Sequence, residues 1–383
     1  MKINESYKGF ETGPIRPPSE AGSLMLRVTR NCPWNQCKFC GLYKGKKFSK
    51  RPVEHVKQDI DILRKHIDRI RAAVAPQDPV SSDLMAVIDG TNKENQASLH
   101  SALSWYRGGM DSVFLQDANT LILKPDDLVE ILNHLKLLFP QIQRITSYAR
   151  SHTIARISDA DMARFSAAGL NRIHIGMESA ADEVLEFIKK GVDKNTHIKA
   201  GQRVKRAGIQ LSEYFMPGLG GAEHSRANAI ETADALNQIN PDFIRMRTLA
   251  ITDSSNLAKD VKAGLFTPLN DVDTAKELLL FLEHLDGITS AVKSDHILNL
   301  FQEVDGNLPQ DKDAITSPIK EFLAMDPEQQ MLYRVGRRTG IFSQLTDLKH
   351  PDLLAHAKEA RDRYKVTVDN VDQFTQTIIK QFI

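Results

Sequence analysis

The sequence contains few cysteines and tryptophans and no long hydrophobic run. Its 383 residues include three cysteines and two tryptophans. No apolar stretch approaches the roughly 20 residues that a membrane-spanning helix needs. The first residues, MKINESYKGFETGPIRPPSE, lack the apolar core of a secretory signal. We therefore expect no membrane segment, and the cysteines favour a metal site in a reducing, cytoplasmic compartment over a disulfide scaffold.

An excess of charge of one sign is also absent. The 50 Lys and Arg residues nearly cancel the 49 Asp and Glu residues, which leaves a formal net charge of +1. Nucleic-acid-binding proteins usually carry a basic face. The composition therefore argues against nucleic acid as a partner, and it is typical of a soluble globular enzyme.

Strand-like and helix-like segments alternate through the first two thirds of the chain. Six short apolar or β-branched runs predict strands at 24–29, 112–117, 144–149, 172–177, 209–216 and 242–249. Because helices lie between successive strands, the strands should pair in parallel. The expected fold class is α/β, and the expected architecture is a partial (β/α)6 TIM-like barrel with a C-terminal helical extension. A flat doubly wound sheet is the alternative.

Amphipathic patterns predict the helices. The first has an apolar stripe that recurs every three or four residues, formed by Val53, Val56, Ile60, Leu63, Ile67, Ile70 and Val74. Other helices are expected at 126–139, 158–168, 180–190, 194–207, 222–237, 275–285, 295–304 and 319–325, with Ser294 as an N-cap. After about residue 270 the alternation with strands ends. We expect an N-terminal extension (1–20), a barrel (21–255) with an insertion (76–111), and a helical extension (256–383).

All three cysteines lie in one short stretch, NCPWNQCKFCGL, at residues 31–42. Cys32, Cys37 and Cys40 have the spacing C-x4-C-x2-C and follow the first predicted strand, where the loops of parallel α/β folds carry function. Closed zinc sites and conventional iron–sulfur clusters use four protein ligands. Three cysteines therefore leave one coordination position for another group. A zinc site completed by a histidine such as His55 is the alternative.

This arrangement resembles the radical S-adenosylmethionine (radical SAM) superfamily. The pattern is most similar to the branch of oxygen-independent coproporphyrinogen dehydrogenase and the methylthiotransferases, although the common spacing is C-x3-C-x2-C. The resemblance implies that Cys32, Cys37 and Cys40 hold a [4Fe–4S] cluster whose open iron binds S-adenosyl-L-methionine. It also implies reductive cleavage to a 5′-deoxyadenosyl radical, which abstracts hydrogen from a small-molecule substrate.

The same resemblance implies residues that bind S-adenosylmethionine. Phe39 precedes the last cysteine, where the family has an aromatic residue near the adenine. Asp117 and Asn119 follow the second strand, where the family often has Gly-Gly-Glu, and Asp117 would accept hydrogen bonds from the methionine ammonium. Arg150 and Arg247, near the ends of the third and sixth strands, would pair with the methionine carboxylate or a substrate anion.

Two further motifs follow later strands. Glu178 and Ser179 end the IGMES sequence, which is similar to endings in related families, and would lie near the ribose or amino-acid part of the cofactor. Gly218 belongs to the turn MPGLGG, where glycine allows the backbone to approach the cofactor closely.

The sequence also allows a candidate partner and alternative functions. A lysine-rich segment after the cysteines would suit an acidic electron donor such as flavodoxin or ferredoxin; it contains Lys44, Lys46, Lys47, Lys50 and Arg51. The alternatives to a small-molecule substrate are radical SAM modification of RNA or protein. A non-enzymatic, zinc-stabilised binding module is the third hypothesis.

Overall fold

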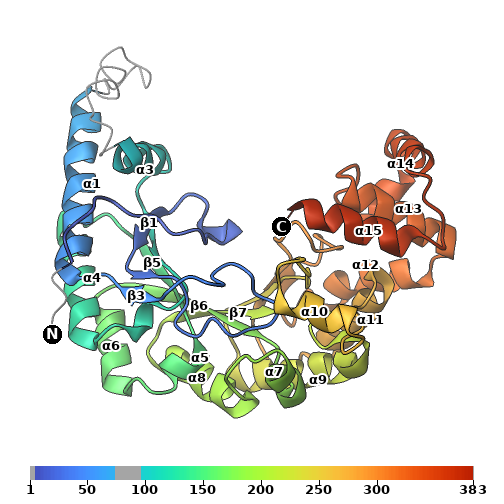
Figure 1. Cartoon of the computed structure of the whole chain (residues 1–383), viewed down its shortest axis with the longest axis horizontal. Helices are drawn as coiled ribbons and strands as arrows, with labels where there is room; N and C mark the ends of the chain where they lie inside the picture. The colour runs from blue at the N-terminus through green and yellow to red at the C-terminus, as the bar shows by residue number, and fades with distance from the viewer. Residues whose placement is uncertain (1–4, 74–95, 383) are drawn as a thin grey trace. The chain divides into compact units, whose positions relative to one another are not determined.

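The computed structural model describes residues 5–73 and 96–382 (Figure 1). Contacts divide the chain into two compact units that interleave along the sequence. The first unit comprises Met1–Pro33, Gly45–Ile175 and Arg203–Gln210, and the second comprises Trp34–Lys44, Gly176–Gln202 and Leu211–Ile383. The predicted domains 1–20, 21–255 and 256–383 stay predictions.

Parallel strands form the centre of the first unit. They lie in the order β1 (Leu24–Arg27), β4 (Ser112–Gln116), β5 (Arg144–Ala149) and β6 (Leu170–Glu178). The end of β6, from Gly176 onward, belongs to the second unit. Each neighbouring pair is parallel, with Leu26 opposite Leu115 and Phe114 opposite Thr146. A doubly wound sheet reverses its strand order at a switch point. Because these strands follow chain order, the winding is that of a barrel-type sheet.

Helices and two minor strands complete the first unit. The minor strands β2 (Thr29–Arg30) and β3 (Ser49–Lys50) pair antiparallel. The helices are α1 (Val53–Ala73), α3 (Gln96–Arg107), α4 (Pro125–Leu138), α5 (Ser151–Ile154) and α6 (Asp159–Ala167), with 3-10 turns η1 (Pro18–Glu20) and η3 (Thr120–Ile122).

The predicted stripe of α1 forms part of the hydrophobic core. α1 packs against α3 and α4 (Figure 1), and five of its stripe residues are fully buried: Val56, Ile60, Leu63, Ile67 and Ile70. Burial of one such side chain contributes about 1.5–3 kcal/mol. Val74 and residues 76–95 of the predicted insertion lie outside the described residues, and α3 occupies part of the remainder.

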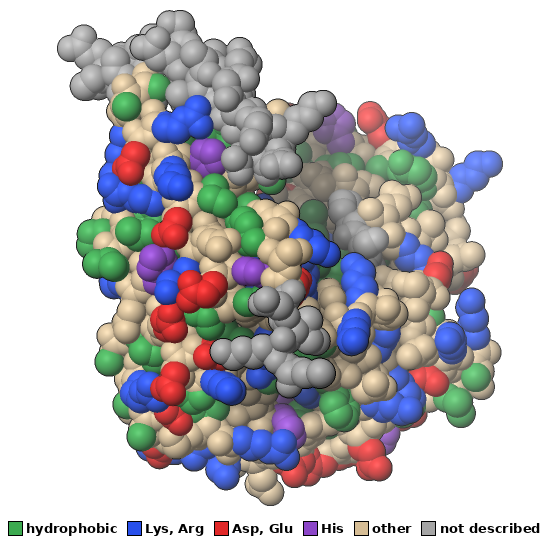
Figure 2. Space-filling view, turned by 60° about the vertical axis from the view of Figure 1, so that its left-hand side comes forward, with side chains coloured by type: hydrophobic (Ala, Val, Ile, Leu, Met, Phe, Trp, Pro, Cys, Tyr) green, Lys and Arg blue, Asp and Glu red, His purple; other side chains and the backbone are tan. Residues whose placement is uncertain are grey.

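The polar sides of α1 and α4 carry charges of both signs. Figure 2 shows basic and acidic side chains next to one another on the face that it presents. Lys57 on α1 pairs with Glu130 on α4 at 2.8 Å, and His134 on α4 lies 2.8 Å from Asp61 on α1. Exposed pairs of this kind each contribute about 0–1 kcal/mol, so the buried stripe dominates the packing of these helices.

The second unit also contains a mainly parallel sheet. The strands β7 (Gln210–Phe215), β8 (Phe243–Met246) and β9 (Ala291–Lys293) are parallel, and β10 (Gly306–Asn307) is antiparallel to β9. The helices are α7 (Asp182–Phe187), α8 (Lys194–Arg206), α9 (Gly221–Ile239), α10 (Asn256–Lys262), α11 (Asp271–His284), α12 (Lys312–Ala324), α13 (Pro327–Arg338), α14 (Pro351–Arg363) and α15 (Val371–Ile379), with η4 (Leu345–Lys349) and η5 (Lys380–Phe382).

Two expectations for the region after residue 270 are wrong. The alternation does not end there, because β9 adds a further parallel strand beside β8. The helix expected at 295–304 is irregular, and Ser294 donates its hydroxyl to the carbonyl of Phe301 at 2.5 Å instead of capping a helix. The Asn299 side chain also binds the backbone of Met246 and Thr248. Such side-chain bonds to backbone compete with helix formation.

The α/β fold class and the helical C-terminal region are confirmed. The six predicted strands correspond to β1, β4, β5, β6, β7 and β8. Within the described part of the chain, no helix has the length and apolar character to span a membrane. The cytoplasmic location stays a prediction.

Candidate functional site

Asp117 forms a buried ion pair at the carboxyl end of β4 in the first unit. Its side chain is fully buried, and Oδ2 accepts hydrogen bonds from Arg27 Nη2 at 2.7 Å and Nε at 3.1 Å. The same oxygen accepts the backbone N–H of Asn31 at 2.8 Å. Among the described residues, Oδ1 has no hydrogen-bond partner. One oxygen of Asp117 is therefore occupied by Arg27 and Asn31. The expected bond from the methionine ammonium to Asp117 stays a prediction.

The N-terminal segment lies over this strand end. Gln116 accepts the backbone N–H of Gly13 at 2.7 Å and donates to the carbonyl oxygens of Gly13 and Ile15. A Cβ on Gly13 would overlap the Asp117 carboxylate. Gly13 is therefore needed for the close approach of the segment to Asp117.

Glu11 ties this segment to three arginines of the first unit. It pairs with Arg30 at 2.6 Å, with Arg51 at 3.4 Å and with Arg27 at 3.6 Å. Burial raises the pKa of Glu11, but the hydrogen bond from Arg30 and the charges of all three arginines outweigh burial and lower it overall. Glu11 is consequently held in its ionised form, which neutralises part of the positive charge of the arginines.

Asn119 and Arg150 meet in the first unit. Asn119 Oδ1 accepts the backbone N–H of Arg150 at 3.0 Å, and Asn119 Nδ2 donates to Thr153 at 2.9 Å. Asn119 therefore fixes the start of α5 at the end of β5. The predicted cofactor roles of both residues stay predictions.

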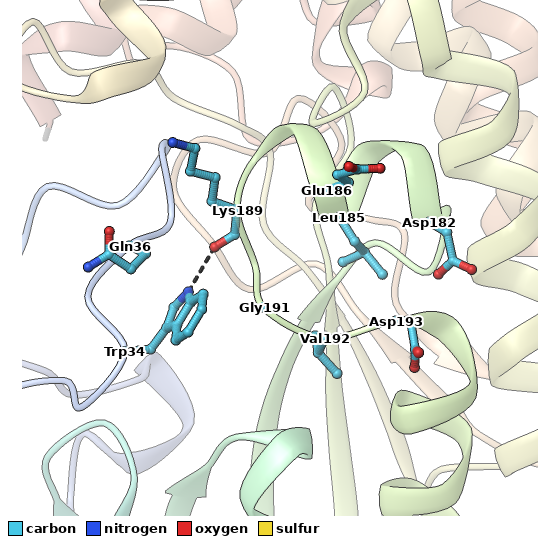
Figure 3. A pocket seen from close by; sticks show the side chains of 9 residues that line it. All are labelled: Trp34, Gln36, Asp182, Leu185, Glu186, Lys189, Gly191, Val192 and Asp193. Atoms are coloured by element: carbon cyan, nitrogen blue, oxygen red, sulfur yellow. Dashed lines mark hydrogen bonds between the residues drawn. The ribbon is translucent and has the colours of Figure 1, made fainter.

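The second half of the cysteine loop belongs to the second unit, where it is held by side-chain and backbone contacts. Trp34 donates from Nε1 to the carbonyl of Lys189 at 2.8 Å (Figure 3). The backbone N–H of Lys38 donates to Ile188 at 2.9 Å, and its carbonyl accepts from Leu257 at 3.0 Å. Cys37 and Cys40 thus lie in a loop that is attached to the turn after α7.

A pocket lies beside this attachment. It has a volume of about 840 Å³, and the loop and the region around α7 both line it (Figure 3); its lining residues are Trp34, Gln36, Asp182, Leu185, Glu186, Lys189, Gly191, Val192 and Asp193.

Phe39 and Glu178, both predicted cofactor residues, each lie near the ammonium group of Lys190. Phe39 packs against the apolar cluster formed by Ala181, Val184, Ile188, Met216 and Leu219. The Nζ atom of Lys190 lies 5.6 Å from the centre of the Phe39 ring and 3.4 Å from Glu178 Oε1. Glu178 has a φ of +68°, which is sparsely populated by residues other than glycine and is typical of functional turns.

Glu213 on β7 is a buried carboxyl coupled to this pair. Within the described residues neither of its side-chain oxygens has a hydrogen-bond partner. Burial raises the pKa of Glu213 well above its usual range, the charge of Glu178 raises it further, and Lys190 lowers it. Burial therefore favours the neutral form of the Glu213 carboxyl over its ionised form.

Ser179 and Gly218 lie at the starts of helices or turns in the second unit. Ser179 is fully buried, and its hydroxyl accepts the N–H of Ala181 at 3.1 Å just before α7. Gly218 has a φ of +86° and donates its N–H to Glu277 on α11 at 2.8 Å. Burial raises the pKa of Glu277 to about 7, although hydrogen bonds from Ser225, Gly218 and Asn228 lower it in part.

Arg247 lies just beyond the carboxyl end of β8. Its backbone N–H donates to Phe215 at 3.0 Å and its side chain is exposed. Its charge adds to burial in lowering the pKa of His296 to about 4, so His296 is neutral near neutral pH.

The cysteines are partly exposed, and no disulfide joins them. Cys32 belongs to the first unit, and Cys37 and Cys40 belong to the second. Across the described residues, no three His, Cys, Asp or Glu side chains are gathered to hold a metal ion. Three thiols on one short loop nevertheless have the donor chemistry of an iron–sulfur cluster. The ligand assignment therefore stays a prediction from spacing.

The sequence did not indicate three residues that interact with predicted site residues in the structure: Lys190, Glu213 and Glu277. Lys190 follows α7 by three positions, and no spacing rule singled it out. Glu213 could have been noticed from the sequence, because it is the one acidic residue in the strand-like run LSEYF. Glu277 lies 59 positions from its partner Gly218, so only the tertiary fold reveals it.

Comparisons with known proteins identify relatives of this chain. Two curated relatives are described as tRNA uridine(34) acetyltransferase. The protein from Methanocaldococcus jannaschii is 25% identical over 118 residues, which cover 30% of this chain and 22% of that protein. The protein from Methanocaldococcus infernus is 22% identical over 248 residues, which cover 58% of this chain and 46% of that protein. The alignments thus span less than half the length of either relative.

Among solved structures, coproporphyrinogen III oxidase from Escherichia coli, described as a radical SAM enzyme, is 14% identical with a TM-score of 0.42, covering 65% of this chain and 50% of that one. The sequence also matches the radical SAM superfamily over residues 26–233, more than half of its 383 residues. The matched region begins within β1 and contains the cysteine loop and the strands β2 to β7. The chain therefore belongs to the radical SAM superfamily of enzymes, whose cofactors are a [4Fe–4S] cluster and S-adenosylmethionine.

Proposed function

We propose that the protein cleaves S-adenosylmethionine reductively at a cluster held by Cys32, Cys37 and Cys40. The observation that carries this proposal is the C-x4-C-x2-C loop directly after β1 and β2, within the region that matches the superfamily. When bound, the cluster would supply the electron that breaks a sulfonium carbon–sulfur bond and yields a 5′-deoxyadenosyl radical. The chain's own residues would bind and orient the nucleotide and exclude water.

The second unit offers contacts for the nucleotide. Phe39 would present its ring to the adenine, because its ring packs on an apolar cluster and is held beside Lys190. Glu178 and Ser179 would accept or donate hydrogen bonds at the ribose or the amino acid. Gly218 would let the backbone approach the ligand closely, since it has no side chain and adopts a φ of +86°.

In the first unit, Asp117 is proposed to receive the methionine ammonium through Oδ1. Arg27 already occupies Oδ2. Because Gly13 lies against Oδ1, the N-terminal segment would have to move before a ligand reached that oxygen. Arg150 and Arg247 remain candidates for the carboxylate of methionine or for a substrate anion.

For the target we propose an RNA nucleoside, ahead of the small molecule expected from the sequence. Both curated relatives are described as tRNA uridine(34) acetyltransferase. The near-zero net charge argued against nucleic acid, but a local basic segment is sufficient for a phosphate contact. Lys46, Lys47 and Lys50, which follow the cysteine loop, are exposed. A small-molecule substrate is the second candidate, and an acidic electron donor docking on the same lysines is a further proposal.

The experiment begins with anaerobic reconstitution and metal analysis. About four irons with sulfide per chain are expected, whereas stoichiometric zinc alone would favour the zinc-stabilised module. The reconstituted protein is then reduced in the presence of S-adenosylmethionine, with or without a tRNA pool. The 5′-deoxyadenosine that forms is quantified. RNA should increase the rate and acquire a modified nucleoside detectable by mass spectrometry. If RNA has no effect while a small-metabolite extract accelerates the reaction, the target is a small molecule.

A further inference from the structure

Trp34 and Gly191 form a close contact inside the second unit. Gly191 has a φ of +70°, and a Cβ there would overlap the indole ring of Trp34. The indole therefore lies directly against the backbone of the turn that follows α7. No residue other than glycine combines this positive φ with such a close approach at low cost.

Hydrogen bonds fix the same two segments to each other. Trp34 donates to Lys189 at 2.8 Å, and the N–H of Lys38 donates to Ile188 at 2.9 Å. The two donors lie on either side of Cys37 in the sequence, and the acceptors are adjacent residues of one turn. The backbone on both sides of Cys37 is therefore attached to residues 188–191.

Lys38 also anchors the loop in a second direction. Its ammonium lies 2.9 Å from Asp260 and 4.0 Å from the centre of the Phe187 ring, and its carbonyl accepts the N–H of Leu257 at 3.0 Å. These contacts connect the loop to α10 and the end of α7. Trp34 also lines the pocket of about 840 Å³, beside Lys189 and Gly191 (Figure 3). The loop is thus anchored through Trp34 on one side of Cys37 and through Lys38 on the other.

We propose that Trp34 and Gly191 are positioning residues that hold Cys37 and Cys40 in the geometry for cluster binding. The inference rests on the proposed ligand role of the cysteines. We call the contact of Trp34 with Lys189 and Gly191 the indole clamp. A loop that supplies three ligands has fewer bonds to the cluster to keep it ordered than a loop that supplies four. Contacts outside the cysteines, such as the indole clamp, would therefore keep the loop in place.

The test uses two variants of the clamp and one matched control. In Gly191→Ala the added methyl group collides with the indole ring of Trp34. Trp34→Phe keeps an aromatic ring but removes the N–H donor. Gly208→Ala is the control, because Gly208 has the same φ of +70° and nothing within 4 Å of a Cβ. The control therefore experiences the backbone strain of an alanine at positive φ without the collision.

Cluster release is the main readout, measured as iron captured by a chelator from the reconstituted full-length chain. Gly191→Ala should release iron at least fivefold faster than Gly208→Ala, and Trp34→Phe should be intermediate. The electron paramagnetic resonance lines of the reduced cluster should broaden in the same order. Thermal unfolding of the cluster-free proteins should place Gly191→Ala and Gly208→Ala within a few degrees of each other.

A second measurement keeps the proposal testable if a variant loses iron through misfolding. Incorporation of 5-fluorotryptophan gives one fluorine signal each for Trp34 and for Trp105, the other tryptophan, which is 1% exposed. In the cluster-free Gly191→Ala protein the Trp34 signal should shift and the Trp105 signal should stay. Iron release within twofold of the control, with an unmoved Trp34 signal, would overturn the clamp. If the wild-type protein itself binds no iron, the proposed function fails instead.

Discussion

Glu277 accepts the backbone N–H of Gly218, and this bond ties helix α11 to the glycine-rich turn that follows β7. The N···O distance is 2.8 Å, and Asn228 on α9 donates to the same Oε1 atom at 2.8 Å. Glu277 is 2% exposed. One carboxyl group from the helical region after residue 270 therefore determines the position of a turn at the carboxyl end of a parallel strand, where α/β enzymes bind their ligands.

The pH dependence of stability should reveal this carboxyl group. Burial raises the pKa of Glu277 to about 7 from 4.5 in the unfolded chain. The folded state therefore binds the Glu277 proton more tightly than the unfolded chain does. The contribution of this proton to the free energy of unfolding is fully present below pH 4.5 and is lost as pH rises through 7. We expect wild type to lose on the order of 3 kcal/mol relative to Glu277→Gln between these limits. Urea unfolding from pH 5 to 8.5 measures the difference, and parallel curves would contradict the assignment.

The buried ion pair of Asp271 should respond strongly to mutation. Asp271 is 7% exposed and pairs with Arg338 at 2.5 Å and Arg334 at 3.2 Å. Replacing Asp271 with Asn removes the counter-ion of the buried Arg338 guanidinium and leaves Arg334 with Asp372 as its partner. Breaking a buried pair in this way typically costs about 3–5 kcal/mol. The exposed pair Lys320–Glu283, at 3.1 Å, provides the control Glu283→Gln, which should change stability by less than about 1 kcal/mol.

Acid should weaken the same interaction. Burial raises the pKa of Asp271, but the charges and hydrogen bonds of Arg338 and Arg334 lower it overall. The contribution of ionised Asp271 to stability is therefore present above the ordinary aspartate range and is lost as pH falls through the lowered pKa.

The free energies of unfolding of Asp271→Asn and Glu283→Gln are compared in urea at pH 7. Equal values would show that the ion pairs of Asp271 contribute little.

Gly13 should be intolerant of any side chain. A Cβ at this position overlaps the carboxylate of Asp117, which is held by Arg27 and cannot retreat without breaking that pair. Overpacking of this kind costs about 1–3 kcal/mol. Gly22→Ala is the matched control, because nothing lies within 4 Å of its Cβ position.

Limited proteolysis together with urea unfolding measures the effect of Gly13→Ala. The N-terminal segment should be cleaved faster than in Gly22→Ala, and the free energy of unfolding should be lower. Identical cleavage rates in the two variants would mean that Gly13 does not lie against Asp117.

The elements with strong periodicity were predictable from the sequence. The strand at 144–149 and the buried stripe of α1 were predicted correctly, because both run long enough to show their period. β9 was not, since the three residues Ala291–Lys293 are too few to show alternation. The predicted helix at 295–304 failed because Ser294 and Asn299 bind backbone groups with their side chains.

The candidate site was predictable only in part. The family resemblance singled out Asp117 as an acceptor for the methionine ammonium, which stays a prediction. Its partner Arg27 lies 90 positions earlier, and no local pattern connects the two residues. Lys190 and Glu277 likewise acquire their roles through contacts between distant segments. Local sequence therefore indicates where chemistry can occur, and tertiary contacts decide which side chains are coupled there.

The most direct test of the central claim is cleavage of S-adenosylmethionine by the reconstituted protein. Under reducing, oxygen-free conditions, wild type should release 5′-deoxyadenosine and methionine. Cys37→Ala should fall to the background of the cluster-free protein, whereas Gln36→Ala, which alters the exposed neighbouring side chain, should retain activity. Cleavage by Cys37→Ala at the wild-type rate would contradict the proposed cluster ligands.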